Sequence, residues 1–238
     1  MKLTISSILV LLSALATAQL EESPINPGNP SIILHNVTTT GTGCPPTTSS
    51  NSSLEVLGAH NIAQLKHTFS TTASYGPSIQ HTDSFRMCKL TATLSYLPTY
   101  DLSITYWNRT ISTIALENPK ITAVNNEYLW FDNQRYYPDG FIFGVKTFTG
   151  PLETKDVKAP FFPVDRKLTV PPAECGTSSS AKVEGGRRYV QLNLESQVNI
   201  QGSNGATPRT GNPGAPVGTF GGEVGYSVQL VWNKSEGC

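Results

Sequence analysis

Three carboxylates that could do acid/base chemistry lie close together in an aromatic stretch of the chain. Glu127 and Asp132 flank Tyr-Leu-Trp-Phe, and Asp139 follows a few residues later. A pair of carboxylates hydrolyses a glycosidic bond when one side chain acts as acid and the other as base or nucleophile. Glu127 and Asp132 are an odd number of positions apart, so on a regular strand they would face opposite sides. A polysaccharide hydrolase using Glu127 or Asp132 is therefore an alternative and not our leading interpretation.

Nucleophilic and metal chemistry have less support in the sequence. The chain has four histidines, which are His35, His60, His67 and His81. None belongs to a His-x-His or His-Glu-x-x-His pattern, and no Gly-x-Ser-x-Gly elbow marks a nucleophilic serine. The sequence therefore predicts no catalytic residue, no metal site and no cofactor.

Aromatic side chains could serve binding instead of catalysis, because exposed rings often mark interaction surfaces. The candidates for a flat stacking platform on a glycan are Trp107, Tyr128, Trp130, Tyr136 and Tyr137. The competing interpretation, which we favour, is that these residues are ordinary core and turn residues of a β-protein.

Composition excludes some partners. The chain has 238 residues, with 38% hydrophobic and 14% charged residues, and its 17 basic residues balance its 17 acidic residues. A nucleic-acid partner is not expected, because phosphate binding needs a concentrated positive patch. After the N-terminus no segment is long and apolar enough to predict a membrane span.

The N-terminus has the pattern of a secretory signal peptide. Lys2 precedes an apolar stretch, and Ala16-Thr17-Ala18 supplies small residues at a cleavage site, so residues 1–18 are expected to be removed and the protein to be extracellular. Asn-x-Ser/Thr acceptors for N-glycosylation agree with secretion, and they are Asn36, Asn51, Asn108 and Asn233.

An even set of cysteines suits two disulfides in an oxidising compartment. Cys44, Cys88, Cys175 and Cys238 allow three pairings, and sequence alone does not choose among them. We prefer Cys44–Cys88 with Cys175–Cys238, because each bond then closes a contiguous half of the chain. No pair has the short spacing of a zinc site.

The elements that must position these residues are short strands. The stretch 85–97 alternates between apolar and polar residues, as in a strand with one buried face. The other expected strands are 31–34, 54–57, 62–69, 101–107, 111–116, 127–132, 141–148, 167–170, 189–194, 198–200 and 224–232. Asn108 is expected to end a strand or to lie at an edge, because a glycan acceptor must be exposed.

The spacing of these strands predicts an all-β fold, an antiparallel β-sandwich or partly closed barrel stapled by two disulfides. A single domain over residues 19–238 is expected, with an irregular N-terminal arm (19–53). The Gly/Pro-rich segment 201–222 is expected to be a mobile loop.

Several motifs occur in an order that resembles a known family. Gly-Thr-Gly-Cys-Pro begins at Gly41, Asp-Ser-Phe-Arg-Met-Cys ends at Cys88, and Phe-Thr-Gly-Pro begins at Phe148. Cys175-Gly176 and then Val231-Trp232 before Cys238 complete the set. The chain resembles the fungal secreted family called domain of unknown function 4360 over essentially its whole mature length. Pro46 stands where that family usually has glycine, an expected Asp-Gly turn is absent, and the Gly/Pro-rich loop is expanded.

The resemblance implies a fungal source, secretion and an all-β fold with the two preferred disulfides, but no activity and no catalytic residues. The leading hypothesis is a secreted, non-catalytic glycoprotein that binds a cell-wall glycan or a host component, or associates with a surface. The alternatives are a secreted polysaccharide hydrolase and a host-directed effector.

Overall fold

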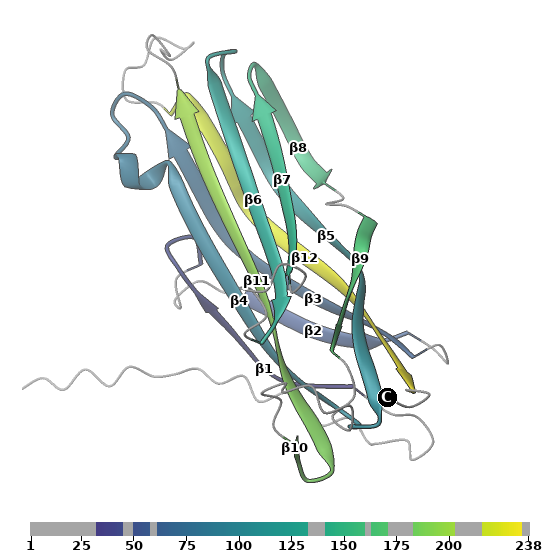
Figure 1. The fold of residues 1–238 in the computed structure, drawn as a ribbon. Helices are drawn as coiled ribbons and strands as arrows, with labels where there is room; N and C mark the ends of the chain where they lie inside the picture. The colour runs from purple at the N-terminus through teal and green to yellow at the C-terminus, as the bar shows by residue number, and fades with distance from the viewer. Residues whose placement is uncertain are drawn as a thin grey trace, which may run out of the picture.

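The computed structural model describes residues 32–44, 50–57, 61–132, 141–159, 163–170, 183–202 and 216–234. Within these ranges the chain is built from strands, with one short 3-10 turn, η1 (His81–Asp83). Two antiparallel sheets pack face to face as a β-sandwich (Figure 1). None of the described residues forms a helix that could cross a membrane.

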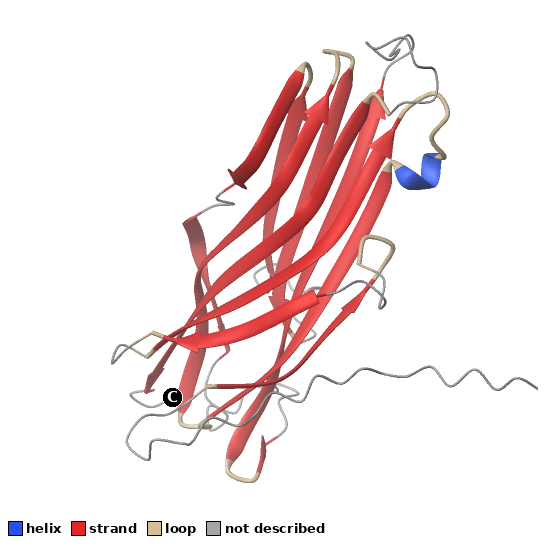
Figure 2. Cartoon of the chain, turned by 180° about the vertical axis from the view of Figure 1, so that it is seen from behind, coloured by secondary structure: helices blue, strands red, loops and turns tan. Residues whose placement is uncertain are grey.

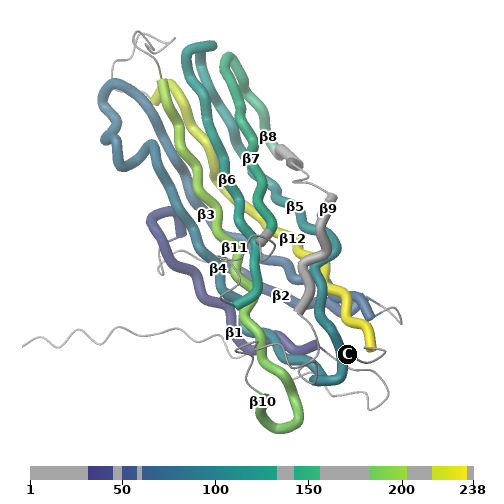
Figure 3. Tube along the Cα trace, viewed as in Figure 1, coloured from purple at the N-terminus to yellow at the C-terminus, as the bar shows by residue number. Residues whose placement is uncertain are grey.

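Each sheet has six strands. Sheet A has the order β1 (Ile33–Thr40), β4 (Phe85–Tyr96), β11 (Arg187–Gly202), β6 (Ile121–Phe131) and β7 (Phe141–Thr149). Its short sixth strand, β10 (Val183–Glu184), turns back on β11 through Gly185 and Gly186 (Figure 3). Sheet B has the order β2 (Ser50–Val56), β3 (Ile62–Tyr75), β12 (Gly218–Lys234), β5 (Tyr100–Leu116) and β8 (Leu152–Ala159), and β9 (Pro163–Val170) also pairs with β5. Seen from behind, strands make up nearly all of the described chain (Figure 2).

Alternation along β4 shows why these residues form a half-buried strand. Five side chains of one phase lie between the sheets and are at most 4% exposed, and they are Cys88, Leu90, Ala92, Leu94 and Tyr96. The other phase faces outward and is partly exposed from Lys89 to Thr93, whereas Ser95 at its end is buried. The expected strand at 85–97 is therefore confirmed.

The core between the sheets has two apolar parts with a polar layer between them. Along β6, Ile121 and Ala123 belong to one apolar cluster and Leu129 and Phe131 to the other. The inward residues between them are Asn125 and Glu127, both fully buried. β5 repeats this order, with Trp107 in one cluster, Ile111 in the other and buried Arg109 between them.

The strand registers align the polar layer across each sheet. In sheet B the inward residues Ser52, His67, Tyr226 and Arg109 lie opposite one another on four adjacent strands. In sheet A, Ser196 of β11 lies opposite Glu127 of β6 and Cys88 of β4. The layer thus runs across the width of the sandwich.

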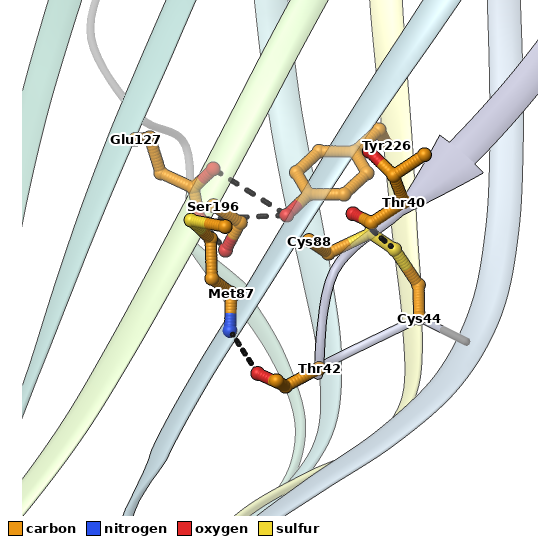
Figure 4. The surroundings of a disulfide bond; sticks show 8 residues. All are labelled: Thr40, Thr42, Cys44, Met87, Cys88, Glu127, Ser196 and Tyr226. Atoms are coloured by element: carbon orange, nitrogen blue, oxygen red, sulfur yellow. Dashed lines mark hydrogen bonds between the residues drawn. A yellow bond between two sulfur atoms is a disulfide. The ribbon is translucent and has the colours of Figure 1, made fainter.

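The disulfide between Cys44 and Cys88 is present, as predicted, and joins the turn after β1 to β4 (Figure 4). Gly41 has φ of 122°, and a Cβ at this position would collide with the carbonyl oxygen of Met87. The Gly43 amide donates to that same oxygen at 2.8 Å. Close backbone approach therefore requires glycine in this turn. Cys175 and Cys238 lie outside the described residues, so their pairing stays a prediction.

The structure differs from the expected strands in extent. The ranges 101–107 and 111–116 form one strand, β5, and the ranges 189–194 and 198–200 form one strand, β11. Of the two expectations for Asn108, an end of the strand or an edge position, the first is wrong, because β5 continues through this residue and pairs it with Ser227 of β12. On the side of β5 away from β12, the pairing strand changes next to Asn108. Pro163 of β9 lies opposite Tyr106, and Ala159 of β8 lies opposite Arg109.

Two expected irregular segments are partly regular. Within the arm 19–53, residues 33–40 form β1 and 50–53 begin β2. Within the segment 201–222, residues 201–202 end β11 and 218–222 begin β12. The start of β12 is held in the sheet because Val217 and Phe220 are buried in the core. Residues 203–215 lie outside the described ranges.

Candidate functional site

Glu127 is held in the polar layer by a dense set of partners. Its Oε1 accepts hydrogen bonds from Asn125 and Ser196, each at 2.8 Å, and it forms an ion pair with Arg109 Nη1. The Tyr226 hydroxyl donates to the same carboxylate from sheet B at 3.4 Å (Figure 4). Burial raises the pKa of Glu127, and the Arg109 guanidinium opposes that rise.

This placement excludes Glu127 as the acid/base of a hydrolase. Its side chain has no exposed surface, so a polymer cannot reach it. Asp132 lies just beyond β6, and its Oδ1 accepts a hydrogen bond from the backbone amide of Gln191 at 2.7 Å. This bond fixes the end of β6 against β11. The two carboxylates thus hold structure and do not converge on a common cleft. Asp139 lies outside the described residues.

The histidines are dispersed. His67 is buried on the inward face of β3, with its Nδ1 at 2.7 Å from the Ser52 hydroxyl, and burial lowers its pKa to about 4. His35 Nε2 lies 2.7 Å from the Ser95 hydroxyl, His81 lies exposed in η1, and His60 falls outside the described ranges. Within the part of the chain that the structure describes, no three His, Cys, Asp or Glu side chains gather to hold a metal ion.

Two members of the expected aromatic platform are in fact buried. Trp107 belongs to the core with no exposed surface, and Trp130 is 3% exposed, so neither ring can stack on a glycan. Trp107 is buried because it lies on the inward phase of β5. Trp130 lies on the outward phase of β6, where the ammonium of Lys89 sits 5.4 Å from the ring centroid. Tyr136 and Tyr137 lie outside the described residues.

Tyr128 is the platform candidate that remains partly exposed, and it belongs to an array on the outward face of sheet A. The registers of β4, β11, β6 and β7 place outward side chains in cross-strand rows, and the three rows that follow the row of Trp130 towards Phe85 hold the large exposed apolar side chains. These three rows, which we call the sheet A face, are Lys89–Glu195–Tyr128–Phe143, Met87–Gln197–Asn126–Val145 and Phe85–Asn199–Val124–Thr147.

Large apolar side chains concentrate on this face. Phe143 is 46% exposed, Val145 41% and Phe85 39%, although each is a residue type that usually lies in a core. The rings of Tyr128 and Phe143 have centroids 4.9 Å apart and planes at 31°. At that separation the two rings contact each other in a tilted arrangement on the outward face of the sheet, and Phe143 keeps nearly half of its surface exposed.

Polar side chains form a strip along β11 between these apolar groups. Glu195 is 4% exposed and accepts a hydrogen bond from Gln197 at 2.7 Å, and Asn199 follows two positions later, partly exposed. The three rows contain one lysine and one glutamate, which lie opposite each other, so the face has no net formal charge. The sheet A face therefore combines apolar contact with neutral hydrogen-bonding groups.

The glycosylation acceptors lie mainly on the other side. Asn51, Asn108 and Asn233 face outward from sheet B, opposite Thr68, Ser227 and Asp101 respectively. Asn36 faces outward from β1, at an edge of sheet A. Whether these residues carry glycans stays a prediction.

Sequence reasoning missed most of the sheet A face. Along β7 both phases contain apolar residues, since Phe143 and Val145 alternate with Ile142 and Gly144. The pattern alone cannot say which phase faces outward. The alternation of β11, with Glu195, Gln197 and Asn199 on one phase, is the signal that would have found the polar strip.

No family model and no curated protein matches the chain. The resemblance to domain of unknown function 4360 therefore stays a prediction. One similar solved structure is described as a carbohydrate-binding module of the β-sandwich superfamily, with 12% identity and a TM-score of 0.25. That alignment covers 83% of this chain, which spans only 56% of the other.

A second similar structure is a carbohydrate-binding module in complex with β-1,4-galactotriose, with 8% identity and a TM-score of 0.25. It covers 82% of this chain and 92% of the other. At this level of similarity neither structure bears on what this chain binds.

Proposed function

We propose that this protein is a non-catalytic, extracellular saccharide-binding protein and that the sheet A face is its binding surface. The observation that carries the proposal is the Tyr128–Phe143 pair, with Tyr128 partly exposed and Phe143 exposed, beside the polar strip of β11. A saccharide ring has an apolar C–H side and a rim of hydroxyls. Such a ligand needs aromatic surface and hydrogen-bonding side chains next to each other, which is what the rows provide.

Two features support a binding role over hydrolysis. The carboxylate that would act as acid or base, Glu127, is enclosed in the core, and the sheet A face presents Glu195 as its single carboxylate. Retaining and inverting hydrolysis both need a pair of carboxylates across the bond. The signal-peptide pattern and the glycosylation acceptors support an extracellular location for the protein and its proposed ligand.

The proposal is tested with purified secreted protein in native gels that contain soluble polysaccharides. We expect slower migration in at least one polysaccharide gel than in a gel without it, and no release of reducing sugar on long incubation. Unchanged migration with every polymer would overturn saccharide binding, and release of sugar by the wild type would overturn the non-catalytic role.

A further inference from the structure

The sheet A face is organised in strips that run along the strands. Gln197 and Asn199 on β11 have uncharged amide side chains, and Asn126 on β6 lies opposite Gln197. Apolar side chains flank this strip on both sides, with Phe85 and Met87 on β4 and the Tyr128–Phe143 pair with Val145 towards β7. The face thus changes from apolar to polar and back to apolar in the direction across the strands, whereas each strip keeps its character in the direction along the strands.

From this arrangement we infer that the ligand is a neutral, linear oligosaccharide lying parallel to β11 and β6. The inference rests on the proposed function and specifies its ligand. An oligosaccharide in this direction can place its hydroxyls on the amide strip along all three rows. Its apolar sides then lie against the apolar side chains that flank the strip. A chain that crossed the strands would meet one row only.

Charge selects a neutral ligand. Lys89 and Glu195 lie opposite each other in the first row, and the other two rows have no charged side chain. An acidic polysaccharide such as polygalacturonate would need cations spaced along the strip, as phosphate- and carboxylate-binding sites provide. The sheet A face has Lys89 alone, and it sits over the Trp130 ring.

The length of the strip selects an oligosaccharide. The three rows span five residues of β11, from Glu195 to Asn199, which are four steps of about 3.4 Å each along a strand. The contact region is therefore about 14 Å long, before the reach of the side chains is added. A single sugar ring would fill only part of it, so affinity should rise with chain length until the rows are covered.

The opposite face supplies a matched control. Tyr106 on β5 is 38% exposed and faces outward from sheet B, in the row of Gln64 and Gln229. Its exposure is close to that of Phe85 (39%) and somewhat below that of Phe143 (46%), but it lies on the far side of the sandwich. Its replacement tests whether any exposed ring contributes to binding.

The experiment measures calorimetric affinity for neutral oligosaccharides of one to six units, taken from a polysaccharide that retards the wild type. Three variants are compared, Phe143→Ala in the first row, Asn199→Ala in the third row and Tyr106→Ala on sheet B. We expect Phe143→Ala and Asn199→Ala each to weaken binding of the longer oligosaccharides by about tenfold, the equivalent of one stacking or hydrogen-bonding contact. Tyr106→Ala should bind like the wild type, and 0.5 M NaCl should leave affinity unchanged, since a neutral ligand is not screened.

Unfolding curves in urea confirm that each variant is folded. The inference is overturned if Phe143→Ala or Asn199→Ala binds like the wild type, if a monosaccharide binds as tightly as a trisaccharide, or if polygalacturonate binds more tightly than the neutral polymers. In each case saccharide binding itself stands. If the wild type binds no saccharide at all, the proposed function fails and the inference fails with it.

Discussion

At the scale of single residues, the buried Arg109–Glu127 pair is the main electrostatic feature of the core. The Arg109 guanidinium lies 5.4 Å from the Phe220 ring centroid and 5.5 Å from that of Tyr226, and it forms an ion pair with the Glu127 carboxylate. Removing both charges from water costs several kcal/mol per ion, so the pair persists only because its partners are in place. Neither the Arg109 charge nor the Glu127 charge would be stable in the core without the other.

Glu127→Gln should lower the free energy of unfolding by about 3–5 kcal/mol, because it leaves the Arg109 charge buried without its counter-ion. The measurement is urea unfolding with linear extrapolation. Glu55→Gln is the control, because Glu55 pairs with Lys66 at the surface and both side chains are about half exposed. That change should stay within about 0.5 kcal/mol. A loss below about 1 kcal/mol for Glu127→Gln would contradict the structural role of the pair.

His67 should make stability depend on pH in a defined window. Burial lowers its pKa from 6.5 to about 4, so the folded protein keeps this imidazole neutral where the unfolded chain takes up a proton. The contribution is complete above pH 6.5 and is lost as the pH falls towards 4. By linkage it amounts to about 2 kcal/mol between pH 7 and pH 5.

The check compares the free energy of unfolding at pH 7 and pH 5 for the wild type and for His67→Phe. The difference between the two pH values should be smaller in the variant by about 2 kcal/mol. Equal differences in both proteins would show that His67 does not stay neutral in the folded state.

Sequence alone could not identify this polar layer. Glu127 invites a catalytic interpretation because its partner, Arg109, is 18 positions away and belongs to the opposite sheet. The partnership depends on how the two sheets face each other, which strand periodicity does not encode. Tyr128 could be selected because its aromatic type is visible in the sequence, but the same signal also selected the buried Trp107 and Trp130. The outward position of Phe143 followed only from the β6–β7 register.

At the scale of elements, inward/outward alternation was enough to predict most strands and the sandwich class. It failed where a strand carries many charges, as in β8 with sequence LETKDVKA. It also failed where polar residues interrupt an apolar run inside a long strand, as at Arg109 in β5 and Ser196 in β11. These interruptions look like strand ends in the sequence, but in the structure they are the polar layer.

The Cys44–Cys88 bond joins positions separated by 44 residues, and closing a loop of that length should stabilise the fold by about 4 kcal/mol. We expect the double variant Cys44→Ala, Cys88→Ala to unfold at correspondingly lower urea concentration. Peptide mapping of this variant without reduction should recover Cys175 joined to Cys238. A peptide with free Cys175 thiol would contradict the second disulfide.

At the scale of the whole molecule, the two outward faces differ in what they can carry. Asn51, Asn108 and Asn233 project from sheet B, whereas the proposed saccharide site lies on sheet A. Glycans attached at these three positions would cover one face and leave the other open. The sandwich would then approach a polysaccharide with sheet A.

The triple variant Asn51→Gln, Asn108→Gln, Asn233→Gln should lose mass from the secreted protein, measured by intact mass spectrometry, but keep its saccharide affinity within about twofold. Asn36→Gln provides the comparison at the edge of sheet A. A loss of affinity in the folded triple variant would show that sheet B takes part in binding.

The polar layer also has a consequence for how the strands find their partners. Alternation forbids a slip of one residue, because every apolar side chain would turn outward, but a slip of two residues keeps each side chain on its own face. Such a slip of β5 along β12 would move Arg109 about 7 Å along the strand, away from Glu127 and into the apolar core. Both charges would then be buried alone, at a cost of several kcal/mol. Hydrophobic patterning thus disfavours registers that are shifted by an odd number of residues. The Arg109–Glu127 ion pair disfavours those that are shifted by an even number.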